Sequence, residues 1–305
     1  MRVRLPAACA ALFLAATSVG RAQAPQAAEG LTETLHTVRL ARGTELNLQV
    51  SRRDGTTPTT AVLLFAGYPG VLRIRSDNGV LRHDLAGNFL VRARRFLNTA
   101  QTFTVLVDCP VDRHEHCDDD YRSSADHIAD IAAVVEAVRA NFGARQVYLV
   151  GTSYGTVSSS FLARGLGGKI HGAVHTATFT DPRRQRNAHG QPMRDFDWSK
   201  TAVPQLFVHH REDPCEVTRY DSVVARRKDV PLITVEGAAN VRGEPCLAFT
   251  QHGFVGRERG DGVDPRLDHR AQDAGGGRRS GAVGRGAAGR LIAARSAHAV
   301  SNAGR

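Results

Sequence analysis

One stretch near the middle of the chain decides the fold: Val147-Tyr148-Leu149-Val150-Gly151-Thr152-Ser153-Tyr154-Gly155. Its first four residues form an apolar run typical of a buried strand, and the residues through Leu166 can continue as a helix. The intervening Gly-x-Ser-x-Gly requires a turn so sharp that the serine adopts a strained backbone conformation and exposes its hydroxyl. Five residues alone are a weak signal. Placed between an apolar strand and a helix, they predict a tight strand–turn–helix with Ser153 at its tip.

The elements on either side of this turn alternate between strands and helices. Apolar residues at three- and four-residue spacing predict a helix over 124–141, and Gly143 provides its end. The predicted strands span residues 37–40, 46–50, 61–65, 102–107, 146–150, 170–175, 205–209 and 232–235. The first two alternate apolar and polar residues, which indicates an antiparallel edge hairpin. Without an internal repeat or a Pro/Ser linker, residues 31–260 are predicted to form one α/β domain with a largely parallel sheet.

Composition and charge exclude several classes of protein. The chain has 305 residues, of which 42% are hydrophobic and 6% aromatic, as in ordinary globular proteins. No apolar run approaches the ~20 residues of a membrane-spanning helix, which excludes a multi-pass membrane protein. The net charge of +10 lies mostly at the ends: residues 1–24 have three arginines and no acid, and residues 261–305 have eight arginines against four aspartates. The nearly neutral middle therefore lacks the basic surface of a nucleic-acid binder.

Residues 1–24 have the pattern of a secretory signal peptide. Arg2 and Arg4 precede an apolar stretch over 7–16, and Ala22-Gln23-Ala24 is a small-x-small cleavage site. The apolar stretch is too short for a stable membrane anchor. We therefore expect cleavage after Ala24 and an exported protein, either periplasmic or secreted.

The last 45 residues, 261–305, differ from the domain in composition. Gly, Ala and Arg provide 27 of them, and Lys, Glu and aromatic residues are absent. Such a segment buries too little apolar surface to offset its ordering entropy, which predicts a disordered tail. The abrupt change near Gly260 also fits an out-of-frame reading of a GC-rich gene. In that case another frame beyond codon 260 should encode an amphipathic helix.

Ser153 is the predicted nucleophile. A serine nucleophile needs a base to accept its proton and an acid to orient that base. The strand over 205–209 ends in His210-Arg211-Glu212-Asp213-Pro214, which favours Asp213 as the acid, with Glu212 as the alternative. The base is expected after the last strand, and His252 is the histidine there that precedes the tail. Its Gln-His-Gly-Phe turn can expose an imidazole. His209 and His210 both precede the acid. His209 is expected to be a strand residue packed inside the protein, and His210 is expected to be a loop residue on the outside.

Acyl transfer also needs two backbone donors directed at the developing oxyanion. The N–H of Tyr154, directly after Ser153, is one candidate. The other is the N–H of Tyr68, within the loop Ala66-Gly67-Tyr68-Pro69-Gly70 that follows a buried strand. An ordinary Gly/Pro turn is the alternative interpretation of that loop.

These residues together resemble the α/β-hydrolase superfamily of exported serine hydrolases, over roughly residues 35–258. The resemblance rests on the Gly-Tyr-Pro-Gly loop, the Gly-Thr-Ser-Tyr-Gly turn, and Asp213 and His252 in family order. It implies a mostly parallel twisted sheet of about eight strands with helices on both faces, and a small lid insert at roughly residues 178–201. Two features depart from the family: the tail replaces the helix that normally follows the histidine, and about 16 residues separate the last strand from His252.

Four cysteines remain after signal cleavage, and in an oxidising compartment they favour disulfides. If the acid and base loops of the resembled family meet, Cys215 and Cys246 can bond, leaving Cys109 to bond Cys117. Pairings between these two sets stay open, because all these loops share one face of the fold. His114 and His116 beside Cys117 resemble half of a metal site, but a second half with ligand spacing is missing.

The resemblance therefore implies a serine hydrolase that cleaves a carboxylic ester through an acyl-enzyme, with no cofactor and no metal. Its expected partner is a small-molecule acyl substrate, with no nucleic acid, no stable membrane anchor and no prediction of oligomeric state. Peptide or amide hydrolysis on the same triad is the alternative. A catalytically impaired hydrolase-fold protein that lacks its C-terminal helix is another. The basic residues Arg92, Arg94 and Arg95 are expected to form a solvated helix face.

Overall fold

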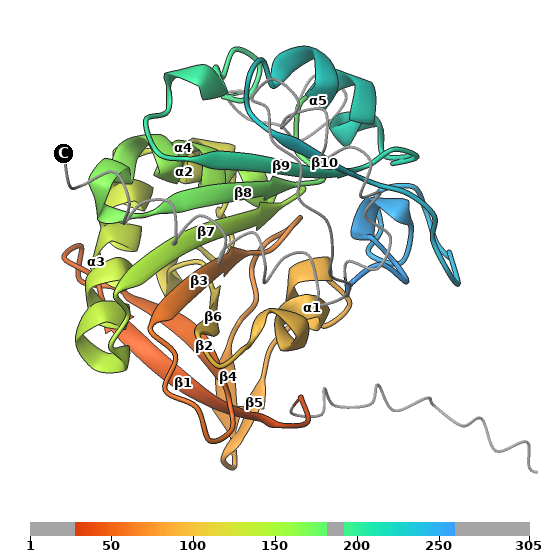
Figure 1. Cartoon of the computed structure of the whole chain (residues 1–305). Helices are drawn as coiled ribbons and strands as arrows, with labels where there is room; N and C mark the ends of the chain where they lie inside the picture. The colour runs from red at the N-terminus through yellow and green to blue at the C-terminus, as the bar shows by residue number, and fades with distance from the viewer. Residues whose placement is uncertain (1–27, 182–191, 260–305) are drawn as a thin grey trace, which may run out of the picture.

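The computed structural model describes residues 28–181 and 192–259 (Figure 1). The predicted signal peptide at residues 1–24, the tail at residues 261–305 and part of the expected lid insert lie outside these described residues. None of the helices in the described part has the length and hydropathy needed to cross a bilayer.

An eight-stranded sheet forms the centre of the fold, with the strand order β1-β2-β6-β3-β7-β8-β9-β10. Its strands are β1 (Leu31–Arg39), β2 (Glu45–Arg53), β3 (Thr60–Phe65), β6 (Thr102–Val107), β7 (Gln146–Thr152), β8 (Gly172–Thr176), β9 (Gln205–His210) and β10 (Leu232–Val235). The β1–β2 and β2–β6 pairs are antiparallel, and every other neighbouring pair is parallel. The expected edge hairpin and parallel sheet are therefore present. The carboxyl ends of β3, β7, β8, β9 and β10 meet at one edge.

Helices cover both faces of the sheet (Figure 1). On one face α3 (Ala125–Phe142) and α4 (Gly155–Leu166) pack against Ala61, Leu63 and Phe65 of β3. On the other face α1 (Phe89–Leu97) packs against Val62 and Leu64 of the same strand. The apolar run of β3 is continuous because alternate side chains of a central parallel strand enter two different cores.

Local capping residues fix the ends of the predicted long helix. The Ser124 side chain accepts a hydrogen bond from the His127 N–H at the start of α3, and Gly143 ends the helix with φ 69°. Glycine adopts this left-handed conformation without the steric penalty of a Cβ atom. These two residues account for helix boundaries within one residue of those expected from the sequence.

Helix α1 corrects one prediction, because its basic residues are not a uniformly solvated face. Arg94 is buried, and its Nε lies 2.8 Å from Glu33 Oε1 on β1. Arg92 is half-buried and pairs with Glu258 at 2.9 Å, whereas Arg95 alone is exposed. Arg94 therefore ties α1 to the edge strand β1, and Arg92 ties it to the segment around Glu258. Burial of a guanidinium requires such a charged partner.

The structure also contains elements that the sequence did not indicate. A second sheet pairs the short strands β4 (Arg75–Asp77) and β5 (Val80–Arg82), and two short helices, α2 (Asp119–Arg122) and α5 (Tyr220–Arg226), follow β6 and β9. These elements are three to seven residues long, and the two short strands are largely exposed. Hydrophobic periodicity does not detect elements this short.

Candidate active site

Ser153 stands at the carboxyl end of β7 in the strained conformation that its sequence predicts. Its φ is 51°, in the left-handed region that non-glycine residues rarely adopt, and α4 begins two residues later. A Cβ at Gly151 would collide with Gly155 O, and a Cβ at Gly155 would collide with Phe65 O. Both glycines are therefore needed for β7 to turn directly into α4. The start of α4 faces the serine, where the helix dipole favours negative charge.

The loop after β3 passes directly over the serine turn. A Cβ built on Gly67 would lie 3.1 Å from Ser153 Cβ, which shows how closely the two backbones approach. Tyr68, the next residue, is 61% exposed, and its ring contacts the Tyr154 ring edge-on at 5.9 Å between centroids. The loop that contains Tyr68, one of the two predicted oxyanion donors, therefore borders Ser153.

The predicted acid and base meet in the structure. Asp213 follows β9 and His252 follows β10, and His252 Nδ1 lies 3.2 Å from Asp213 Oδ2. The other carboxylate oxygen, Oδ1, accepts the N–H of Cys215 at 2.9 Å. The Asp213 side chain is fully buried, whereas Glu212 is exposed on the loop surface. The geometry therefore joins His252 to Asp213 rather than to Glu212.

His252 itself is less accessible than its turn suggested. The residue is 6% exposed and lies in a one-turn 3-10 helix, Gln251–Gly253. Thr250 caps this turn by accepting the His252 N–H at 3.2 Å, and the following Phe254 is buried against Phe89 at 4.7 Å between ring centroids. Packing of the turn against α1 thus replaces the exposed imidazole that was expected.

A disulfide connects the acid loop to the base loop. Cys215, two residues after Asp213, is bonded to Cys246, which lies six residues before His252. This is the pairing expected from the meeting of the two loops. The long connection between β10 and His252 is therefore anchored within the site.

The neighbouring histidines of β9 are both buried. His209 Nδ1 lies 4.0 Å from Asp213 Oδ2, and within the described part of the chain neither of its ring nitrogens has a hydrogen-bond partner. Burial lowers the pKa of His209 to about 4 and keeps its ring neutral. His210 was expected outside the strand, but it is fully buried, since Gly237 O lies 2.9 Å from its Nε2. The loop after β10 folds back over it.

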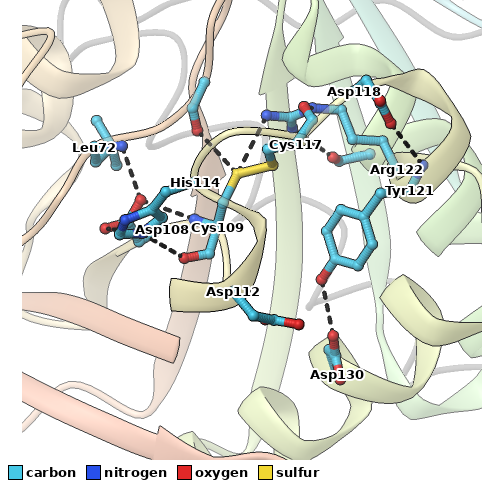
Figure 2. The surroundings of a disulfide bond; sticks show 12 residues. Leu72, Asp108, Cys109, Asp112, His114, Cys117, Asp118, Tyr121, Arg122 and Asp130 are labelled. Carbon is cyan, nitrogen blue, oxygen red and sulfur yellow. Dashed lines mark hydrogen bonds and ion pairs between the residues drawn. A yellow bond between two sulfur atoms is a disulfide. The ribbon is translucent and has the colours of Figure 1, made fainter. Parts of the chain in front are cut away.

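A buried arginine, Arg122, packs against the residue that follows Ser153, and nothing in the sequence indicated it. Figure 2 shows Arg122 beside Cys109 and Cys117. Arg122 on α2 donates to Ser158 Oγ at 2.9 Å and to Cys117 O at 2.9 Å, and its guanidinium lies 5.1 Å from the centroid of the Tyr154 ring. Tyr154 OH in turn donates to Asp119 Oδ1 at 2.7 Å, and burial raises the pKa of this phenol. The residue after Ser153 is therefore held by two charged side chains of α2.

The second disulfide lies beside the same arginine. Cys109 and Cys117 are bonded, as expected, and Arg122 Nη2 lies 3.6 Å from Cys109 Sγ (Figure 2). Cys117 Sγ is thus engaged in a covalent bond, and His114 Nε2 lies 3.2 Å from the carbonyl oxygen of Cys109. Among residues 28–181 and 192–259, no three His, Cys, Asp or Glu side chains are grouped to hold a metal ion.

The aromatic residues of the expected lid insert belong to the core. Phe179, Phe196 and Trp198 are buried against Phe207 of β9 and Val223 of α5. Their aromatic rings form part of the packing behind the site instead of an apolar cover over it.

The comparisons with known proteins agree with this fold. Residues 118–250 match the family model of serine aminopeptidase, S33. Est1E from Butyrivibrio proteoclasticus, bound to ferulic acid, matches with a TM-score of 0.52 at 15% identity, over 86% of this chain and 99% of that chain. A PEG-bound cold-adapted esterase from an Arctic intertidal metagenomic library matches with a TM-score of 0.50 at 13% identity, over 80% of this chain and 99% of that chain. The chain has no significant match among curated protein sequences.

At these identities the structural matches establish a shared fold. The segment that matches the family model contains Ser153 and Asp213. It ends two residues before His252. The strand order, the turn at Ser153 and these matches converge: the chain has the α/β-hydrolase fold, and its residues 118–250 are similar to a family of serine hydrolases.

Proposed function

We propose that the protein is a serine hydrolase that cleaves carboxylic esters through an acyl-enzyme. The observation that carries this proposal is the hydrogen bond between His252 Nδ1 and Asp213 Oδ2 at 3.2 Å, at the sheet edge where Ser153 occupies its strained turn. Asp213 follows β9, two strands along from β7, so the acid–base pair and the nucleophile share one face of the fold.

In the proposed mechanism Ser153 Oγ attacks the acyl carbonyl while His252 Nε2 accepts its proton. The carbonyl becomes a tetrahedral oxyanion, and His252 then returns the proton to the leaving alcohol. Asp213 keeps the proton of the neutral ring on Nδ1 and stabilises the imidazolium as it forms. Water attacks the acyl-enzyme in a second cycle of the same proton transfers and releases the acid.

The oxyanion requires donors that are fixed before the reaction begins. We assign this role to the backbone N–H groups of Tyr154 and Tyr68. Support for Tyr154 comes from its position at the start of α4 and from the fixation of its side chain by Asp119 and Arg122. Support for Tyr68 comes from the close approach of Gly67 to Ser153.

Peptide or amide hydrolysis is the second candidate. It is favoured by the match of residues 118–250 to a serine aminopeptidase family, whereas the cold-adapted enzyme among the structural matches is an esterase. Ester cleavage stays first because a carboxylic ester has a better leaving group, and Phe179, Phe196 and Trp198, the aromatic residues of the expected lid, are buried in the core.

The experiment is active-site labelling combined with hydrolysis assays. The wild-type chain should react with a fluorophosphonate probe and hydrolyse p-nitrophenyl butyrate faster than alanine p-nitroanilide. Ser153→Ala should abolish both labelling and hydrolysis, while the matched control Ser222→Ala on α5 should behave as wild type. Full activity of Ser153→Ala would reject the proposal, and faster cleavage of the anilide would favour the aminopeptidase alternative.

We also infer that the protein acts outside the cytoplasm. The two disulfides fit an oxidising compartment, and residues 1–24 have the pattern of a signal peptide. Amino-terminal sequencing of the exported chain should begin at Pro25. Recovery of active protein only from the cytoplasm, with Met1 retained, would contradict this inference.

A further inference from the structure

A third side chain contacts both the proposed acid and the proposed base. Thr218 closes the 3-10 turn Glu216–Thr218 that follows the acid loop, and it is fully buried. Its Oγ1 lies 2.9 Å from Asp213 Oδ2 and 3.0 Å from His252 Nδ1. The three atoms therefore form a closed triangle, since Nδ1 and Oδ2 are themselves 3.2 Å apart.

The chemistry of the three groups fixes the direction of each hydrogen bond. An ionised carboxylate accepts only, so the single hydroxyl hydrogen of Thr218 points to Asp213 Oδ2. The lone pairs of Oγ1 are then left for the Nδ1–H of His252. Asp213 Oδ1 is already occupied by the Cys215 N–H, which leaves Oδ2 as the oxygen shared by threonine and histidine.

We propose that Thr218 is a positioning residue that provides a second acceptor for the Nδ1–H of His252 and orients the Asp213 carboxylate toward it. This inference rests on the proposed function, because it assigns a role in the same acid–base pair. The hydroxyl keeps the proton of the neutral imidazole on Nδ1 and restricts rotation of the ring. Nε2 is thereby kept free to accept the proton of Ser153.

The surroundings of Thr218 make its hydroxyl specific for this role. Its backbone N–H closes the turn on Cys215 O at 3.1 Å, so the backbone is fixed independently of the side chain. Both hydrogen-bond partners of the hydroxyl belong to the proposed triad. A threonine that only filled space would tolerate valine, which has the same shape and is also β-branched.

The test compares three variants by steady-state hydrolysis of p-nitrophenyl butyrate. Thr218→Val should lower kcat about tenfold and leave KM within about twofold, because one net hydrogen bond is lost from the transition state and none from substrate binding. Thr218→Ser retains the hydroxyl and should recover most of the lost kcat. The matched control is Thr201→Val, which removes a hydroxyl that is buried ahead of β9, at the opposite end of that strand from Asp213, and that has no partner among the described residues.

Each outcome decides the inference. A kcat for Thr218→Val equal to that of Thr201→Val would overturn it, as would a Thr218→Ser variant no more active than Thr218→Val. A loss of activity that follows a lower urea midpoint, with KM and kcat both changed, would assign Thr218 a structural role only. Failure of the proposed function is seen separately, since wild type and Ser153→Ala would then hydrolyse the ester equally.

Discussion

Asp213 illustrates how a single carboxylate is selected over its neighbour. Its two oxygens accept hydrogen bonds from Cys215, Thr218 and His252, and its side chain is fully buried, whereas Glu212 is exposed. Asp213→Asn would place an amide NH₂ or a weaker acceptor against Nδ1 and favour the wrong tautomer of the ring. We expect kcat to fall by about 10³-fold or more.

Glu212→Gln is the matched control for this substitution, because it neutralises the adjacent residue of the same loop. Its kcat should stay within about twofold of wild type, since an exposed charge near the loop surface is well screened. Measured kcat values for the two variants separate the acid from its neighbour. The opposite ranking would make Glu212 the acid.

At the scale of the elements, the Cys215–Cys246 bond joins the loop after β9 to the loop after β10. The two cysteines are 31 residues apart, and neither loop is held by the sheet ladder. Replacing both cysteines with alanine should reduce kcat about tenfold, because Asp213 and His252 lose a constraint on their separation. The loss of stability should be about 3–4 kcal/mol from the closed-loop entropy.

This prediction is checked by comparing activity with secondary structure in the double variant. Far-UV circular dichroism at 20 °C should match wild type while kcat is reduced, since the sheet does not depend on the bond. A variant with unchanged kcat would show that packing alone positions the two loops.

Hydrophobic patterns in the sequence predicted the long helices and strands but missed the short ones and one buried charge. The core strands and α3 were predicted within a few residues, because β3, β6 and β7 are largely apolar and α3 has apolar residues at three- and four-residue spacing. The β4–β5 hairpin was missed because its six residues are polar or only partly buried. The burial of Arg94 was missed because its partner, Glu33, lies 61 residues away in the chain.

For the whole molecule, buried histidines make stability depend on pH. Burial lowers the pKa of His127 to about 3 and the pKa values of His175 and His209 to about 4. In the unfolded chain these rings titrate near ~6.5, so between pH 6.5 and 4 the unfolded state binds more protons. The contribution of these three histidines to the free energy of unfolding is therefore fully present above pH ~6.5, and it is lost as the pH falls toward 4. Each ring contributes up to about 1.4 kcal/mol per pH unit.

His127→Phe isolates one of these contributions. The His127 ring packs 4.9 Å from the Tyr121 ring and 6.2 Å from the Phe65 ring, and within the described residues neither nitrogen has a hydrogen-bond partner, so phenylalanine can replace it. Urea unfolding at pH 5, 6, 7 and 8 should show a pH slope smaller by about 1.4 kcal/mol per unit below pH 6. Between pH 7 and 8 the two slopes should agree. An unchanged slope below pH 6 would show that His127 does not resist protonation in the folded state.

The sequence by itself determined the strand–turn–helix at Ser153, the parallel sheet and the order of Asp213 and His252 along the chain. These features are local or periodic: two glycines permit φ 51° at Ser153, and apolar runs specify buried strands. Only the tertiary structure placed Thr218 between Asp213 and His252 and set Arg122 under Tyr154. Both depend on loops that meet because parallel strands end at one edge, and no local pattern marks a single threonine or arginine for burial there.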